Sequence, residues 1–168
     1  MNRMVILLAA VFLIFIGAMS SIYVVDEREK VLVLQFGRVV ATKEDPGLSF
    51  KIPVIQNVVR YDDRILSRDI DPLEVTPLDD RRLVVDAFAR YRIIDVNKFR
   101  EVTGASGDTA ISIAGARLDR ILSSQTREIL GSVSSNNILS QDRFALMLRI
   151  RNGAILEAEK MGIEVVDV

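Results

Sequence analysis

The sequence contains no cysteine and no histidine among its 168 residues. Their absence excludes zinc sites built on these ligands, cysteine nucleophiles and every Ser-His-acid triad. It also removes the side chain that most often serves as a base near neutral pH. A chain without cysteine fits an oxidising compartment and the cytosol equally well, so its absence does not indicate a location.

Long blocks of like charge are also missing. Arg3 is the only charged residue before Asp26, so the rest of the chain carries 21 of the 22 basic residues and all 23 acidic ones, a net charge of −2. This balance predicts no nucleic-acid partner and no electrostatic lipid switch. With 49% hydrophobic residues, the part beyond residue 25 is long enough for one compact core, with room for two small subdomains.

An uncharged run of 22 residues, from Met4 to Val25, stands out and is followed at once by Asp26-Glu27-Arg28-Glu29-Lys30. A helix of this length spans roughly 33 Å, enough to cross a hydrocarbon core of about 30 Å. We therefore predict an uncleaved transmembrane signal anchor over residues 1–25. Its membrane-contacting residues are predicted to be Val5, Ile6, Leu7, Leu8, Val11, Phe12, Leu13, Ile14, Phe15, Ile16, Ile22 and Tyr23, with the Tyr23 ring at the headgroup level.

Two other interpretations of this run stay open. A cleaved secretory signal is supported by Arg3, the apolar stretch and the small residues at 18–20, although the apolar character continues through Val25. A buried helix of a soluble protein is the third interpretation. The basic residues that flank the run do not decide which side of the membrane the remainder occupies.

Alternation of apolar and polar residues predicts the strands. Strand-like segments cover 22–40 with a turn at Gly37-Arg38, 48–52, 54–61 and, most clearly, 83–94, where Val85, Ala87, Ala89, Tyr91 and Ile93 share one face. Pro72 and Pro77 predict that residues 65–83 are irregular or form an edge. A last strand begins at Ile163.

Helical spacing takes over in the second half of the chain. A short helix is predicted over 95–102 and a long one over 108–131, with an apolar stripe of Ile111, Ala114, Leu118, Ile121, Leu122, Gln125 and Ile129. Residues 134–137 read as a loop. A second long helix from Ser140 to Gly162 is predicted to bury Phe144, Met147, Leu148, Ile155, Ala158 and Met161. The order of elements predicts an α+β fold, with helices on one face of a mainly antiparallel or mixed sheet and room for two subdomains that divide near residue 95.

The segments that could carry catalytic or ligand-binding residues match the known motifs only weakly. The segment Gly104–Thr109 lacks the lysine of a phosphate-binding loop and is better explained as a helix cap. The acidic pairs at 62–63, 69/71 and 79–80 lack the spacing of a calcium loop and read as solvated turns. No serine lies in a nucleophile turn. We therefore predict no catalytic residue, no cofactor site and no metal site, and so no enzyme.

The segment Gly47–Ile55 is more informative, because it is an apolar hairpin tip only about 20 residues after the predicted membrane exit. A strand of the protein core is the simpler explanation. The functional alternative is a second membrane contact, in which Leu48, Phe50, Ile52, Val54 and Ile55 dip into the near leaflet.

Several motifs in a fixed order also resemble the stomatin/prohibitin/flotillin/HflK-HflC (SPFH, or band 7) superfamily. After the apolar run, residues 25–38 read Val-Asp-Glu-Arg-Glu-Lys-Val-Leu-Val-Leu-Gln-Phe-Gly-Arg. Residues 45–53 are similar to the family's Pro-Gly-Leu-His-Phe-x-x-Pro signature, with Ser49 in place of histidine. Similar segments follow at 61–64, 83–93 and 161–168, so the resemblance covers nearly the whole chain.

The resemblance implies an SPFH domain over residues 26–168 and a non-catalytic scaffold. In its bacterial branch, such a subunit stays in the inner membrane through a single span, with its C-terminal domain in the periplasm. It assembles with an HflK-like homologue into a ring or cage that limits the access of substrates to an FtsH-type membrane protease. A stomatin-like organiser that binds lipid or regulates another membrane protein is the alternative. The family's long helical region after the domain has no counterpart in the 168 residues, which leaves assembly through that region open.

Overall fold

The computed structural model describes residues 3–139 and 143–168. The chain forms two compact units, Met1–Asp62 (unit 1) and Asp63–Val168 (unit 2). The subdomain boundary that we expected near residue 95 lies inside unit 2. Backbone pairing explains this, because Ile93 pairs with Ile163, and the amides of Ile94 and Asp95 both donate to the Gly162 carbonyl.

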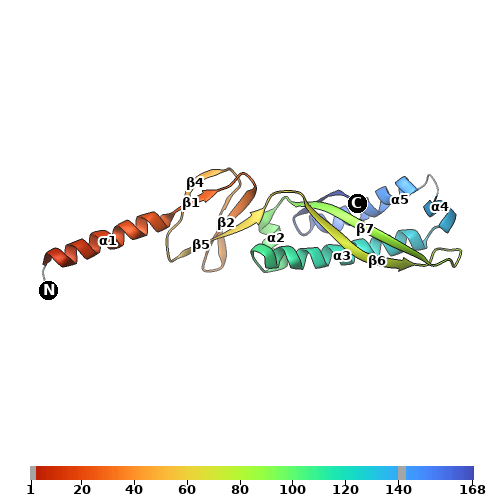
Figure 1. Ribbon diagram of the computed structural model, residues 1–168, viewed down its shortest axis with the longest axis horizontal. Coiled ribbons are helices and arrows are strands. Elements are labelled where there is room, and N and C mark those ends of the chain that lie inside the picture. Colours follow the sequence, from red (N-terminus) through yellow and green to blue (C-terminus); the bar gives the residue numbers. More distant parts are fainter. Residues whose placement is uncertain (1–2, 140–142) are drawn as a thin grey trace. The chain divides into compact units, whose positions relative to one another are not determined.

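Helix α1 (Arg3–Ser21) opens unit 1 (Figure 1) and ends four residues before the predicted limit of the anchor at residue 25. The side chains of Val5, Ile6, Leu7, Leu13 and Ile14 lie outside the described part of the structure. Among the residues that are described, no helix combines the length and the apolar character needed to cross a membrane.

The rest of unit 1 is built from two small antiparallel sheets. Strand β1 (Ile22–Val25) pairs with β4 (Gly47–Phe50). Strand β2 (Glu29–Gln35) lies between β3 (Arg38–Lys43) and β5 (Gln56–Asp62). Tyr23, Val25, Val31 and Val33 form the buried core of the unit, as expected where alternate residues of facing strands are apolar.

The β2–β3 hairpin turn lies one residue earlier than predicted. Gln35 pairs with Arg38, so the two turn residues are Phe36 and Gly37 rather than Gly37 and Arg38. Both have positive φ angles, 50° and 82°, as two-residue hairpin turns of the primed type require. Phe36 therefore points away from the core and is 85% exposed.

A three-stranded antiparallel sheet organises unit 2, in the order β6 (Leu66–Val75), β7 (Leu83–Ile93) and β8 (Ile163–Asp167). The predicted alternation of β7 is confirmed, because one face of the strand is buried or half-buried and the other is exposed. Residues 66–75 form the strand β6, so the expectation of irregular structure over these residues was wrong. Strand β6 lies at the edge of the sheet, so the alternative expectation of an edge strand was right. Pro72 is accommodated because the β6–β7 register shifts between Ile70 and Leu73.

The described part of unit 2 also contains four helices: α2 (Val96–Thr103), α3 (Gly107–Gly131), α4 (Ser135–Leu139) and α5 (Arg143–Glu159). Helix α3 packs against β6 and α5 packs against β8. Together with the antiparallel sheets, this confirms the predicted α+β class. Residues 135–139 are helical rather than a loop; the Asp79 carboxylate accepts hydrogen bonds from the backbone amide and the hydroxyl of Ser135, at the start of α4.

The buried side of α5 agrees with the prediction at Ala158, and Met161 just after the helix is buried as predicted, but the remainder differs. Phe144, Met147 and Leu148 are exposed, and the buried residues of α5 are Leu146, Ile150, Ala154 and Ala158. These four recur every fourth position and so share one side of the helix. Small residues at 154 and 158 also allow α5 to approach the sheet closely. The predicted start of this helix at Ser140 lies outside the described residues. In α3 the predicted stripe is confirmed at Ala114, Leu118, Leu122 and Ile129.

Candidate membrane interface

Ser21, the last residue of helix α1, is hydrogen-bonded to Lys51, the residue that follows strand β4. The Lys51 amide donates to the Ser21 carbonyl at 2.8 Å, and the Ser21 hydroxyl donates to the Lys51 carbonyl. These bonds satisfy one of the carbonyls that a helix end leaves without a partner. They also fix the segment Lys51–Ile55 beside the point where α1 ends.

The loop that follows Lys51 holds a valine in an unfavourable conformation. Val54 has a φ of 73°, which is a genuine outlier for a β-branched residue. The loop is closed around it by Gln56, whose amide donates to the Ile52 carbonyl at 2.9 Å and whose side-chain Oε1 accepts from the Ile52 amide at 2.8 Å. Val54 is fully exposed and so makes no packing contact that would offset this strain. Strain of this kind is often found at functional sites.

The β1–β4 ribbon adds a second group of exposed apolar side chains. Ile22 lies opposite Phe50, and Val24 lies opposite Leu48. All four side chains are exposed, whereas the alternate residues Tyr23 and Val25 are buried. The ribbon thus presents two apolar cross-strand pairs on its outer face, beside the loop that carries Val54.

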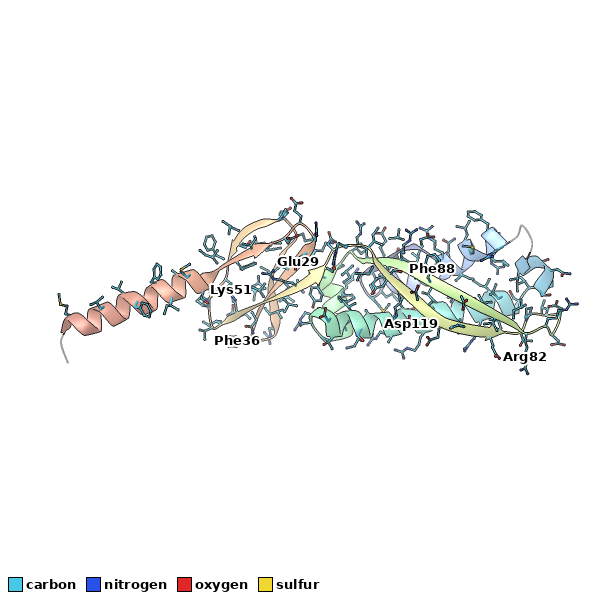
Figure 2. The ribbon with its side chains drawn as sticks, in the orientation of Figure 1. Glu29, Phe36, Lys51, Arg82, Phe88 and Asp119 are labelled. Atoms are coloured by element: carbon cyan, nitrogen blue, oxygen red, sulfur yellow. The ribbon has the colours of Figure 1, made fainter. Side chains whose placement is uncertain are left out.

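Sequence reasoning missed Phe36, which lies at the same end of unit 1. Gln35 pairs with Gln56, so the β2–β3 turn lies next to the Ile52–Gln56 loop. Figure 2 shows Phe36 and Lys51 at the end of unit 1 from which α1 leaves, and Glu29 at the opposite end. A Phe-Gly pair between two strand-like segments was the available signal, because a two-residue turn directs its side chains away from the core.

Charged groups mark the opposite end of the unit 1 sheet. Glu29 pairs with Asp62 across β2 and β5. Arg60 forms an ion pair with Glu29 at 3.1 Å and also donates to the Val24 carbonyl at 3.3 Å. In unit 1 the end near α1 therefore carries exposed apolar side chains together with Lys51, and the end away from it carries the Arg60–Glu29 ion pair, a distribution that suits a surface lying on a bilayer.

The predicted interface residues fall into two groups. Leu48, Phe50, Ile52, Val54 and Ile55 are all exposed, as are Leu8, Val11, Phe12, Phe15, Ile16 and Ile22. Tyr23 differs, because it is only 8% exposed and packs in the core of unit 1. Its ring is therefore not available to lipid headgroups, and we leave it out of the proposed interface.

The segments that were considered for chemistry have structural roles. Gly104 has a φ of 64° and ends α2, and Arg100 donates to the Ala105 carbonyl at 3.3 Å, so residues 104–106 join α2 to α3 and residues 107–109 form the first turn of α3. Within the described residues, no group of three or more acidic side chains could hold a metal ion. Asp79, from one of the acidic pairs, accepts hydrogen bonds from Ser135 at the start of α4. The pKa of Asp79 is lowered mainly by the hydrogen bond from the Ser135 hydroxyl.

Comparison with known proteins defines the class of the chain. The model of the SPFH domain / Band 7 family matches residues 23–168. This match covers all three sheets, apart from Ile22 at the start of β1, and the helices after α1, so the chain belongs to that family.

The curated relatives narrow the similarity. The chain is 30% identical over 151 residues to the Modulator of FtsH protease HflC of Escherichia coli strain K12, covering 86% of this chain and 44% of that protein. It is 32% identical over 172 residues to Protein HflC of Haemophilus influenzae, covering 96% of this chain and 57% of that protein. Protein HflC of Buchnera aphidicola subsp. Schizaphis graminum is 30% identical over 188 residues, with coverage of 100% and 60%. The chain thus spans about half the length of the curated relatives that it matches.

Proposed function

We propose that this protein is a membrane-anchored, non-catalytic scaffold subunit that regulates an FtsH-type membrane protease. In this proposal it assembles with an HflK-like homologue into a ring or cage and limits the access of substrates to the protease. The similarity to a protein named as a modulator of FtsH protease supports the regulatory role. The absence of histidine and cysteine from the sequence fits a subunit without chemistry of its own.

The observation that carries the membrane part of the proposal is the apolar end of unit 1. The uncharged run from Met4 to Val25 leads directly into this end, and α1 is tied to it through Ser21 and Lys51. Exposed apolar residues from three segments gather there: Leu48 and Phe50 of β4, Ile52, Val54 and Ile55 of the following loop, and Phe36 of the β2–β3 turn. A cluster of exposed apolar side chains is typical of an interaction site. We infer that the run anchors the chain and that this surface enters the near leaflet.

A depth measurement tests the membrane contact. A fluorophore attached to Val54→Cys in the full chain, reconstituted in vesicles, should be quenched by lipids that carry a quencher on their acyl chains. The matched position is Glu29→Cys, at the charged end of unit 1, where quenching should be absent. Equal quenching at the two positions would remove the leaflet contact from the proposal.

Co-isolation tests the regulatory part. The tagged full-length protein, extracted in a mild detergent, should carry an HflK-like homologue and an FtsH-type protease with it. Its deletion should increase degradation or processing of membrane-protein substrates. Isolation of a monomer with neither partner would contradict the proposal.

Membrane topology separates this function from its rival. We place the chain in the bacterial inner membrane, with residues 26–168 in the periplasm. A protease added to spheroplasts should then cleave unit 2, and the same protease added to inverted vesicles should not. The reverse pattern would favour the second candidate, a stomatin-like organiser of the membrane, which the exposed apolar side chains of unit 1 also support.

A further inference from the structure

The charged residues of the unit 1 sheets are sorted between the two ends of the strands. The acidic residues of unit 1 all lie in the segments at the end away from α1, and they are Asp26, Glu27, Glu29, Glu44, Asp45 and Asp62. Residues 31–42 and 46–59, which include the turns at the end near α1, contain one charged residue each, Arg38 and Lys51. The exposed apolar side chains near α1 are therefore accompanied by positive charge only.

Backbone pairing holds these two basic residues in one region. Arg38 pairs with Gln35 across β3 and β2, and Gln35 pairs with Gln56 across β2 and β5. Neighbouring strands lie about 4.8 Å apart, so Arg38 is about 10 Å from Gln56. Gln56 closes the loop that follows Lys51, and its Nε2 donates to the Gln35 Oε1 at 3.4 Å. The turn before Arg38 and the loop after Lys51 are thus joined through the Gln35–Gln56 pair.

Neither positive charge is neutralised by the protein. In the part of the chain that the structure describes, the Arg38 guanidinium and the Lys51 ammonium form no ion pair and no side-chain hydrogen bond. Arg60, at the other end, is paired with Glu29. The acidic end is too distant to act on the two cations, because β2 has seven residues and a length of about 20 Å, more than twice the Debye length of about 8 Å at physiological ionic strength.

We propose that Arg38 and Lys51 bind the phosphate group of an anionic phospholipid in the near leaflet. This inference rests on the leaflet contact proposed above, in which Ile52, Val54 and Ile55 lie among the acyl chains. Long basic side chains place their stems on apolar surface and their charges at its polar boundary. Arginine presents N–H donors that match phosphate oxygens, and lysine adds a point charge. The two side chains therefore reach the phosphate level while the loop lies below it.

The expected effect is a preference between lipids rather than recruitment to the membrane. A basic cluster that recruits a protein to anionic lipid has four to eight Lys or Arg residues, whereas two are present here. One basic residue near an anionic surface strengthens association about fivefold, so two give up to about 30-fold at low ionic strength. The apolar run and loop hold the chain at the bilayer, and the two cations select which lipids surround the loop.

Lipid-selective quenching tests this preference, because the chain has no cysteine of its own. The full chain with a fluorophore on Val54→Cys is reconstituted in phosphatidylcholine vesicles. These contain equal small fractions of spin-labelled phosphatidylglycerol or spin-labelled phosphatidylcholine, with the label on the acyl chain. The apparent association constant should be about 5- to 30-fold higher for the anionic lipid and should fall at high salt. Phe36→Cys carries the fluorophore if Val54→Cys lowers the amount of folded protein.

Neutralising the two residues provides the second measurement. Arg38→Gln combined with Lys51→Gln should bring the preference close to unity, while quenching by phosphatidylcholine persists. The matched control is Arg28→Gln combined with Lys43→Gln. It removes the same charge from exposed positions at the end away from α1, so the preference should stay unchanged.

Three outcomes would each overturn the inference: equal quenching by the two lipids, a preference that survives Arg38→Gln with Lys51→Gln, or an equal loss in the control pair. Loss of the preference when inorganic phosphate replaces chloride at the same ionic strength would assign the two residues to a free anion instead of a lipid. Quenching at Val54 without any preference refutes this inference alone. No quenching by either lipid refutes the leaflet contact of the proposed function as well.

Discussion

Replacing Gly162 with alanine tests how the turn after α5 is joined to the start of α2. Gly162 has a φ of 72°, and a Cβ atom placed on it would lie 2.3 Å from the Asp95 carbonyl oxygen and 3.1 Å from the Phe99 amide nitrogen. Both contacts are with backbone, which cannot rotate away. The Gly162 carbonyl also accepts hydrogen bonds from Ile94 at 3.0 Å and Asp95 at 3.1 Å.

Two costs add up for this substitution. A left-handed backbone conformation costs a residue other than glycine about 1–2 kcal/mol. Relieving the overlap with Asp95 separates the two segments and breaks the two hydrogen bonds to Gly162, about 1 kcal/mol each. Asp95 caps α2 by accepting from Asn97 and Lys98, both at 3.0 Å, so any displacement also weakens this cap. We expect Gly162→Ala to lower the free energy of unfolding by about 3–4 kcal/mol.

Gly104→Ala is the matched control. Gly104 has a similar φ of 64° in the same unit, but a Cβ atom there would meet nothing within 4 Å. Only the backbone cost applies, about 1–2 kcal/mol. Urea unfolding of the full chain in mild detergent, followed by far-ultraviolet circular dichroism, gives both values, since most of the helical residues lie in unit 2. Equal losses for the two variants, within about 0.5 kcal/mol, would refute the role given to the contact between Gly162 and Asp95.

Three further predictions concern other residues. Val54→Gly should raise the stability of unit 1 by up to about 1 kcal/mol, because it removes the left-handed strain of a β-branched residue; a loss of stability in urea unfolding would contradict this. The lowered pKa of Asp79 means that its stabilising effect is present above its ordinary pKa and is lost as the pH falls through its folded pKa. The stability difference between the wild type and Asp79→Asn should therefore narrow as the pH falls below that ordinary pKa, and a constant difference from neutral to acid pH would exclude this role. Arg68→Ala and Asp119→Ala, combined in a double-mutant cycle, should give a coupling energy of about 0.5–1 kcal/mol for their bidentate, partly exposed ion pair; additive losses would show that the pair contributes nothing.

The fold class follows from the sequence where one pattern dominates a segment. Strand β7 alternates strictly from Leu83 to Ile93, and the structure buries the expected face. Helix α5 carries apolar residues on two of its sides, and periodicity alone does not choose between them. The larger side chains of Phe144 and Met147 led to the prediction that their side of α5 is buried. In the structure the side that contains Ala154 is buried instead, where α5 approaches the sheet closely. This choice depends on the distance to a partner, which local sequence does not encode.

Some residues of the candidate site could likewise be predicted from the sequence and others could not. The apolar segment Leu48–Ile55 could be singled out because it is short, apolar and close to the predicted anchor. The exposure of Phe36 could be predicted from the Phe-Gly turn, but its place beside Gln56 could not, since it depends on the pairing of β2 with β5. Tyr23 was misplaced for a related reason: the run reads as one apolar stretch, but the helix ends at Ser21 and the next residues alternate as a strand. The hydrophobic content of a run does not reveal where its backbone changes from helix to strand.

The two hydrogen bonds between Ser21 and Lys51 restrict hinge motion between α1 and the β1–β4 sheet in the proposed anchored protein. A transmembrane helix in a thinner or thicker bilayer adjusts by tilting, and in the proposed anchored protein the tilt of α1 would be passed to β4 through these two hydrogen bonds. Local bilayer thickness would thus be converted into an angle of unit 1 above the lipid.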